Sequence, residues 1–116
     1  MNRVIKFRAW NPDNENHPMV QNALFRWDAR ELLNGEGAYK NWTLMQFTGL
    51  LDKNGVEIYE GDIVEFSKSS RTEEIIRLEV KWFQYSGHQG WWPNEIEDMS
   101  VIGNIYENPE LLKEVK

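Results

Sequence analysis

Residues 46–66 read QFTGLLDKNGVEIYEGDIVEF, and this stretch holds the clearest turn signals in the chain. Asp52-Lys53-Asn54-Gly55 predicts a tight turn, because aspartate favours the first position and either Asn54 or Gly55 can take the positive φ that such a turn requires. Glu60-Gly61 predicts a second turn, and a strand-like run follows each of the two. The stretch therefore predicts short strands joined by tight turns, with the rest of the chain laid against them.

The N-terminal side of this stretch carries three further strand-like runs. Val4–Trp10 mixes β-branched and aromatic residues and predicts a first strand. Asn11–Asn14 places a proline among turn-forming residues and ends that strand, so Met19–Trp27 is the expected hairpin partner. Asp28–Leu33 suits a single helical turn capped by its aspartate, before a glycine-containing loop. Thr43–Thr48 predicts the strand that enters the central stretch.

On the C-terminal side, Ser67–Glu74 is polar and predicts an exposed hairpin loop. After it, apolar residues alternate with charged ones, which predicts a strand with one buried and one solvent-facing side. The apolar positions of that strand are Ile76, Leu78, Val80 and Trp82. Tyr85–Asp98 contains two glycines and a proline and is expected to be a long loop, whereas Val101–Tyr106 predicts the last strand. Asn108-Pro109-Glu110 has the residue order typical of a helix start.

Short strands, frequent turns and one short terminal helix together predict the fold class. We expect a mainly β protein, a small and partly open antiparallel β-barrel of an SH3-like kind with a short C-terminal helix. At 116 residues, the chain has the length of a single domain spanning residues 1–116.

The composition narrows the class of partner and the compartment. The formal net charge is −6, which disfavours broad binding to a nucleic-acid backbone and favours a protein partner or another copy of the chain. There is no cysteine, so thiolate chemistry is excluded. We expect no signal peptide and no membrane association, and therefore a cytoplasmic protein.

Three blocks of sequence carry a family resemblance. They are IKFRAW (Ile5–Trp10), LMQFTGLLDKNGVEIYEGDIV (Leu44–Val64) and VIGNIYENPELL (Val101–Leu112). With these blocks, the chain resembles the YopX family, small proteins encoded by bacteriophages and prophages, mostly of Gram-positive bacteria. The resemblance implies a mainly β fold, YopX-like in kind, and a phage or prophage origin, and it brings no catalytic residues.

The tryptophan-rich segment is the first candidate for a contact surface. Trp91-Trp92-Pro93 follows a glycine-flanked segment, and tryptophan is favoured at the energetic centres of protein interfaces. The same side chains could instead cap the core, so both readings stay open. His88 lies in the same segment, and Tyr59 is the fourth candidate partner-binding residue.

Metal and catalytic chemistry find little support in the sequence. His17 and His88 are the only histidines and lack ligand spacing, so we expect no metal, no cofactor and no catalytic residue. Gly87–Gly90 has the GxxG spacing of nucleotide-clamping loops, but lacks the helical context and the positive charge. The central stretch holds an acidic cluster that leaves a metal or acid–base role open. Its members are Asp52, Glu57, Glu60, Asp62 and Glu65.

These observations lead to three functional hypotheses. The first is a non-enzymatic phage accessory protein that acts by binding a protein or by self-association, with a homo-oligomer plausible because short β domains expose strand edges. The second is a nucleic-acid-binding small β-barrel, with nucleic acid an unlikely partner. It rests on a basic and aromatic first strand that includes Arg3, Lys6, Phe7, Arg8 and Trp10. The third is a metal-dependent enzyme that uses the acidic cluster.

Overall fold

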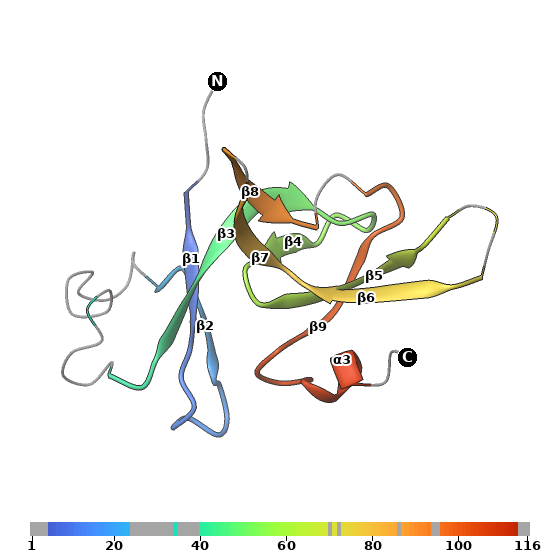
Figure 1. Cartoon of the computed structure of the whole chain (residues 1–116). Coiled ribbons are helices and arrows are strands. Elements are labelled where there is room, and N and C mark those ends of the chain that lie inside the picture. Colours follow the sequence, from blue (N-terminus) through green and yellow to red (C-terminus); the bar gives the residue numbers. More distant parts are fainter. Residues whose placement is uncertain are drawn as a thin grey trace. The chain divides into compact units, whose positions relative to one another are not determined.

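The structure is a computed structural model that describes residues 5–23, 34, 40–69, 71, 73–85, 87–93 and 96–113. The chain divides into two compact units, Met1–Phe47 and Thr48–Lys116. Figure 1 gives the labels of the strands and of the helix. The single domain expected from the sequence stays a prediction, and each unit is described by itself.

The first unit is built on antiparallel strands: β1 (Phe7–Trp10), β2 (Met19–Gln21) and the first half of β3 (Thr43–Leu51). β1 lies between the other two, so that Ala9 pairs with Val20 on one side and with Leu44 on the other. Ala9 and Ala23 are fully buried, and Trp42 and Leu44 pack against them. Small residues at the centre let these strands bury their larger neighbours at close range.

The expected hairpin between the first two strands is confirmed. Asn11 donates its backbone N–H to the carbonyl of Pro18 at 2.7 Å, and the Asn14 side chain accepts from the backbone N–H groups of Asn16 and His17, both at 3.1 Å. The second strand is shorter than predicted, because pairing ends at Gln21 and the next residue takes a positive φ of 53°. The predicted helical turn at 28–33 lies outside the described residues.

The second unit holds the end of β3 and the remaining elements. These are β4 (Glu57–Tyr59), β5 (Asp62–Ser67), β6 (Ile75–Glu79), β7 (Lys81–Tyr85), β8 (His88–Trp92), β9 (Ser100–Asn104) and α3 (Glu110–Lys113). β5 lies between β6 and β9 in one antiparallel sheet, whereas β7 and β8 form a separate hairpin. β4 lies beside β3.

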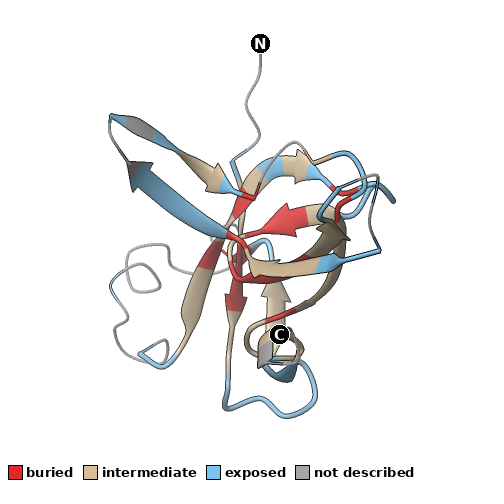
Figure 2. Ribbon diagram, turned by 45° about the vertical axis from the view of Figure 1, so that its right-hand side comes forward, coloured by how far each residue is buried: buried red, intermediate tan, exposed pale blue. Residues whose placement is uncertain are grey.

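The core of this unit is a cluster of fully or almost fully buried side chains: Ile58, Val64, Val80 and Met99. Each comes from a different segment of the chain, so the cluster joins β4 and β5 to the segments before β7 and β9. Figure 2 colours such buried positions red. Partly buried residues, Trp91 of the hairpin among them, pack against the cluster.

Both turns of the central stretch are confirmed. In the first, Asp52 Oδ1 accepts from the backbone N–H groups of Asn54 at 2.8 Å and Val56 at 2.9 Å. In the second, Gly61 has a φ of 88°, a conformation that glycine adopts without steric cost. Its N–H donates to the carbonyl of Val80 at 3.0 Å, which ties this turn to the end of β6.

The prediction of one long strand around residues 76–82 is wrong for the second half of that segment. The run divides at Val80, whose N–H donates to the carbonyl of Asp62 at 2.8 Å, and β7 then leaves β5 and pairs with β8. Val80 is fully buried, but the predicted alternation is not seen before it, because all four residues from Ile76 to Glu79 are partly buried. Trp82, expected on the buried side, belongs to β7, which pairs with β8 and not with β5, and it is 46% exposed.

The long loop predicted for Tyr85–Asp98 is also wrong at its start. His88–Trp92 forms β8, and a two-residue connection that includes Gly87 at a φ of 82° turns the chain back on itself. Gly90, taken as a loop signal, lies in the strand opposite Phe83.

The C-terminal end agrees with the prediction. Asn108 accepts the N–H of Leu111 at its carbonyl at 3.1 Å, and the short helix α3 follows at Glu110–Lys113. Curled antiparallel strands and a short C-terminal helix confirm the expected mainly β, half-barrel fold class. In the described part of the chain, no helix is both long and apolar enough to cross a membrane.

Gly103→Ala is expected to lower the free energy of unfolding by about 1–2 kcal/mol. A Cβ at Gly103 would lie 2.5 Å from Asn108 Oδ1 and 3.0 Å from Asn108 Cβ, so the turn that carries Asn108 must shift. That turn is held by the Asn108 N–H, which donates to the carbonyl of Asn104 at 2.8 Å. Chemical denaturation measures the effect. Gly90→Ala is the matched control, because a Cβ at Gly90 meets no atom within 4 Å.

Candidate functional site

The β7–β8 hairpin concentrates exposed aromatic side chains. Its register pairs Trp82 with Trp91, Lys81 with Trp92 and Phe83 with Gly90. Residues directly opposite each other in an antiparallel pair share a face. One face of the hairpin therefore carries Trp82 and Trp91, and the other carries Lys81, Phe83 and Trp92.

The two adjacent tryptophans of the predicted contact segment have different environments. Trp91 is half-buried and packs against the core cluster, and its ring lies edge-on to Trp82 with the centroids 5.0 Å apart. Trp92 points to the opposite face and is 46% exposed. Of the two alternatives left open by the sequence, a core position describes Trp91 and a surface position describes Trp92.

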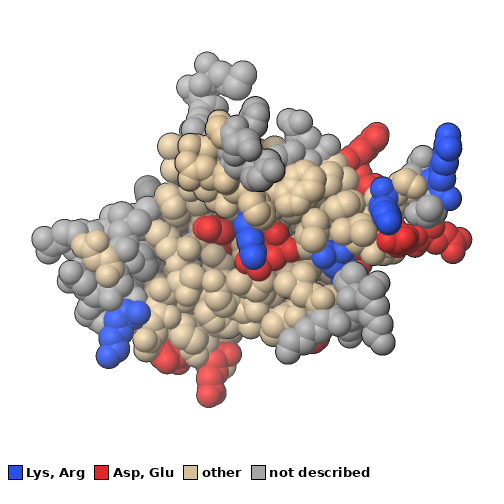
Figure 3. All heavy atoms as spheres, in the orientation of Figure 1, with Lys and Arg blue, Asp and Glu red and all other residues tan. Residues whose placement is uncertain are grey.

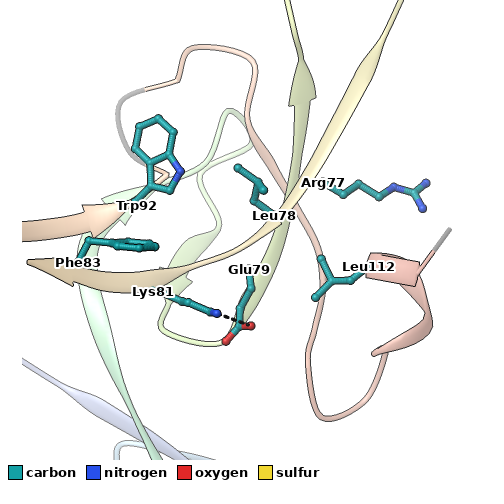
Figure 4. A pocket seen from close by; sticks show the side chains of 7 residues that line it. All are labelled: Arg77, Leu78, Glu79, Lys81, Phe83, Trp92 and Leu112. Carbon is teal, nitrogen blue, oxygen red and sulfur yellow. Dashed lines mark ion pairs between the residues drawn. The ribbon is translucent and has the colours of Figure 1, made fainter. Parts of the chain in front are cut away.

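Beside this hairpin lies an open hollow of about 340 Å³, which we call the aromatic groove. It is lined by Arg77, Leu78, Glu79, Lys81, Phe83, Trp92 and Leu112. Figure 4 shows Phe83 and Trp92 on the hairpin, Leu78 on β6 and Leu112 on α3, at different sides of the hollow. The helix is fixed in part by Arg77, whose Nη1 donates to the Leu111 carbonyl at 3.4 Å.

Charges of both signs lie at the groove. Lys81 Nζ lies 3.7 Å from Glu79 Oε1, with 57% of the lysine side chain and 24% of the glutamate side chain exposed. Arg77 Nε donates to Glu65 Oε2 at 3.0 Å. Figure 3 shows positive and negative side chains next to each other over β6 and β7, amid a surface of other residues. The groove therefore combines an apolar lining with a polar rim, as binding surfaces do.

The structure brings three of the four predicted partner-binding residues to one strand. His88, Trp91 and Trp92 all belong to β8, although the side chain of His88 lies outside the described part of the chain. Tyr59 lies at the end of β4 and is only 3% exposed, so its side chain presents almost no surface. Its backbone N–H donates to the Asp62 carboxylate at 2.7 Å.

Members of the acidic cluster are engaged in the fold. Asp52 is buried and accepts three backbone N–H groups, from Asn54, Val56 and, through Oδ2, Val101 of β9 at 2.8 Å. Burial alone would raise the pKa of Asp52, but the hydrogen bonds from these N–H groups and the charge of Lys53 outweigh it and lower that pKa.

A second carboxylate follows the same rule. Asp98 accepts the backbone N–H of Ser67 at 2.9 Å, and this bond, with the Ser67 side chain, lowers the pKa of Asp98. Among the described residues, no three histidine, aspartate or glutamate side chains gather closely enough to hold a metal ion.

The basic first strand uses its cations within the first unit. Arg8 is buried at 8% exposure, and Lys6 Nζ lies 4.8 Å from the centroid of the Phe47 ring. Such a contact favours a cation by electrostatic attraction to the face of the ring. Arg3 lies outside the described residues.

Sequence reasoning missed Trp82 and Phe83 as surface residues. The segment WFQYSGHQGWW (residues 82–92) contains a signal that could have found them. Two aromatic runs flank a Ser-Gly pair, which is the pattern of a two-residue hairpin. The glycines on either side of His88 instead suggested an irregular loop.

Comparison with known proteins agrees with this architecture. The fold defines a small, mainly β protein with a curled antiparallel sheet. The chain belongs to the YopX family: the sequence model described as "YopX protein" matches residues 6–113. The chain is also similar to a solved structure, protein EF1440 from Enterococcus faecalis, with 26% identity and a TM-score of 0.56. That match covers 96% of this chain and 99% of the other. No curated protein matches.

Proposed function

We propose that this chain is a non-enzymatic binding protein that engages another polypeptide through the β7–β8 hairpin and the aromatic groove. The observation that carries the proposal is the exposure of three large aromatic side chains on one hairpin. Trp82 is 46% exposed, Phe83 48% and Trp92 46%.

The energetic argument rests on the aromatic area that water still covers. Burying apolar surface is favourable by about 25 cal/mol per Å², so a partner that covers Phe83 and Trp92, which share the groove face, gains binding free energy from both rings. Single exposed apolar residues are ordinary, but several on one hairpin beside a hollow are typical of an interaction site. Tryptophan is also enriched among the residues that dominate binding energy.

The biological setting belongs to the same proposal. Membership of the YopX family supports a phage or prophage accessory protein that works in the cytoplasm of a bacterial host. A genomic neighbourhood without phage genes would count against that origin, and fractionation of the host cell tests the compartment.

Site-specific photo-crosslinking tests the binding surface. With a photoreactive phenylalanine analogue in place of Phe83, irradiation in the host cell is expected to give a discrete adduct with one polypeptide. The same analogue at Ile75, an exposed position at the start of β6, is the matched control because 43% of that residue is exposed. An adduct at position 83 and none at position 75 supports the proposal, whereas equal patterns, or no adduct at either position, contradict it.

A further inference from the structure

We propose that the polypeptide bound at the aromatic groove is a second copy of this chain, in a dimer with two-fold symmetry. This inference rests on the proposed function and names its partner. Two properties of the groove carry it, its charges and its shape, and the apolar area that it leaves open limits the strength of the dimer.

The charges suit a copy of the same surface. Lys81 and Glu79 lie 3.7 Å apart, side by side at the groove. In a two-fold interface, a contact between one residue of the first copy and a different residue of the second is repeated with the two copies exchanged. An axis passing beside this pair therefore places Lys81 of each copy against Glu79 of the other. Within one chain the two charges already pair with each other, and the two-fold arrangement keeps each of them opposite a charge of the other sign, whereas a strongly acidic or basic peptide would bring a like charge next to one of them.

The shape is also self-complementary. The hollow has a volume of about 340 Å³, and two aromatic side chains of its lining, Phe83 and Trp92, are themselves about half exposed and available to another copy. One surface thus provides both the hollow and the aromatic groups that fit it. Two copies related by a two-fold axis use both features twice.

The available area sets the strength of the dimer. A buried aromatic side chain covers about 150–250 Å², so the exposed halves of Phe83 and Trp92 offer roughly 200 Å² per copy. A stable interface of standard size buries about 800 Å² per partner. The neighbouring residues of the rim must supply the remainder, so we expect a weak dimer that dissociates at micromolar or higher concentrations.

Charge exchange at the rim tests this geometry. The solution mass is measured by light scattering and by sedimentation between about 1 µM and 1 mM, a range that brackets the expected dissociation. Wild-type protein is expected to pass from monomer to dimer in that range. Lys81→Glu and Glu79→Lys, made separately, place like charges opposite each other twice per dimer and are expected to weaken association about tenfold or more.

Mixing these two variants separates a self-complementary interface from any other surface. The Lys81→Glu chain carries acidic side chains at both positions 79 and 81, and the Glu79→Lys chain carries basic side chains at both. Opposite charges therefore face each other in the mixed pair, and the two chains are expected to form a heterodimer.

The matched controls are Lys68→Glu and Glu74→Lys, which exchange the charges of an ion pair of 3.3 Å on the other hairpin. These control variants are expected to dimerise like the wild type, because their charges lie outside the groove lining. Circular dichroism confirms that each variant is folded.

Each outcome decides the proposal. Dimerisation of the wild type, loss in each groove variant and recovery on mixing support it. A wild-type monomer throughout the range, unchanged dimerisation in the groove variants, or failure to recover on mixing overturns it. If the wild type is monomeric while Phe83 still crosslinks to a different protein, the second copy is excluded and the proposed binding function stands.

Discussion

Asp52→Ala is expected to lower the free energy of unfolding by about 3 kcal/mol or more, the largest effect of a single substitution that we predict. The carboxylate accepts backbone N–H groups from Asn54 and Val56 in its own turn and from Val101 in β9, all at 2.8–2.9 Å. Alanine leaves these donors without their acceptor at a position where Asp52 is only 7% exposed. Hydrogen bonds to charged groups are worth about 1.5–3 kcal/mol each and are not fully additive.

Thermal and denaturant unfolding measure this loss, and Tm is expected to fall by roughly 10 °C for a domain of this size. Asp13→Ala is the matched control, since Asp13 is an exposed aspartate in the turn between β1 and β2. It should change the unfolding free energy by less than about 0.5 kcal/mol. Equal effects of the two substitutions would show that Asp52 does not connect the turn to β9.

The same carboxylate gives stability a defined dependence on pH. The pKa of Asp52 and the pKa of Asp98 are lowered from the ordinary value of 3.8, so the unfolded chain binds protons more readily than the folded chain. The contribution of both groups is fully present above about pH 4 and is lost as the pH falls through their folded-state pKa values. In Asp52→Asn, which cannot titrate, the loss of stability below pH 4 should be smaller than in the wild type.

The local signals in the sequence were sufficient for the turns and for the strands next to them. Asp52 and Gly61 determine the conformation of their neighbours through short-range hydrogen bonds and backbone freedom, so their roles follow from residue type and order. The same holds for Asn108 at the start of α3. Such features need no knowledge of which strand lies beside them.

The candidate site was harder to predict because it depends on a change of strand partner. The alternation that ends at Trp82 gives no sign that the chain leaves β5 at Val80, since a period of two describes either partner. Once β7 pairs with β8, Trp91 packs against the core cluster, whereas Trp82 meets the edge of Trp91 and stays 46% exposed. The Ser-Gly pair at residues 86–87 is a signal for the hairpin, but Gly87 and Gly90 together suggested an irregular loop.

The adjacent tryptophans of β8 are expected to respond differently to the same substitution. Trp91→Ala should lower the free energy of unfolding by about 2–3 kcal/mol, somewhat less than the 3–5 kcal/mol typical of a fully buried aromatic residue. It removes the packing of Trp91 on the core cluster and its edge-on contact with Trp82 at 5.0 Å. Trp92→Ala should cost less than about 1 kcal/mol, because nearly half of Trp92 is already in contact with water.

Association should respond in the reverse order. Trp92 lines the aromatic groove, so Trp92→Ala is expected to reduce crosslinking from position 83, whereas Trp91 lies on the opposite face. Fluorescence separates the two environments in the isolated protein: Trp92→Phe should remove intensity at the red side of the emission band, and Trp91→Phe at the blue side. If Trp92→Ala destabilised the fold as much as Trp91→Ala, Trp92 would be a core residue, and if it left crosslinking unchanged, Trp92 would not contact the partner. In either case, the aromatic groove would lose its main aromatic contact for a partner.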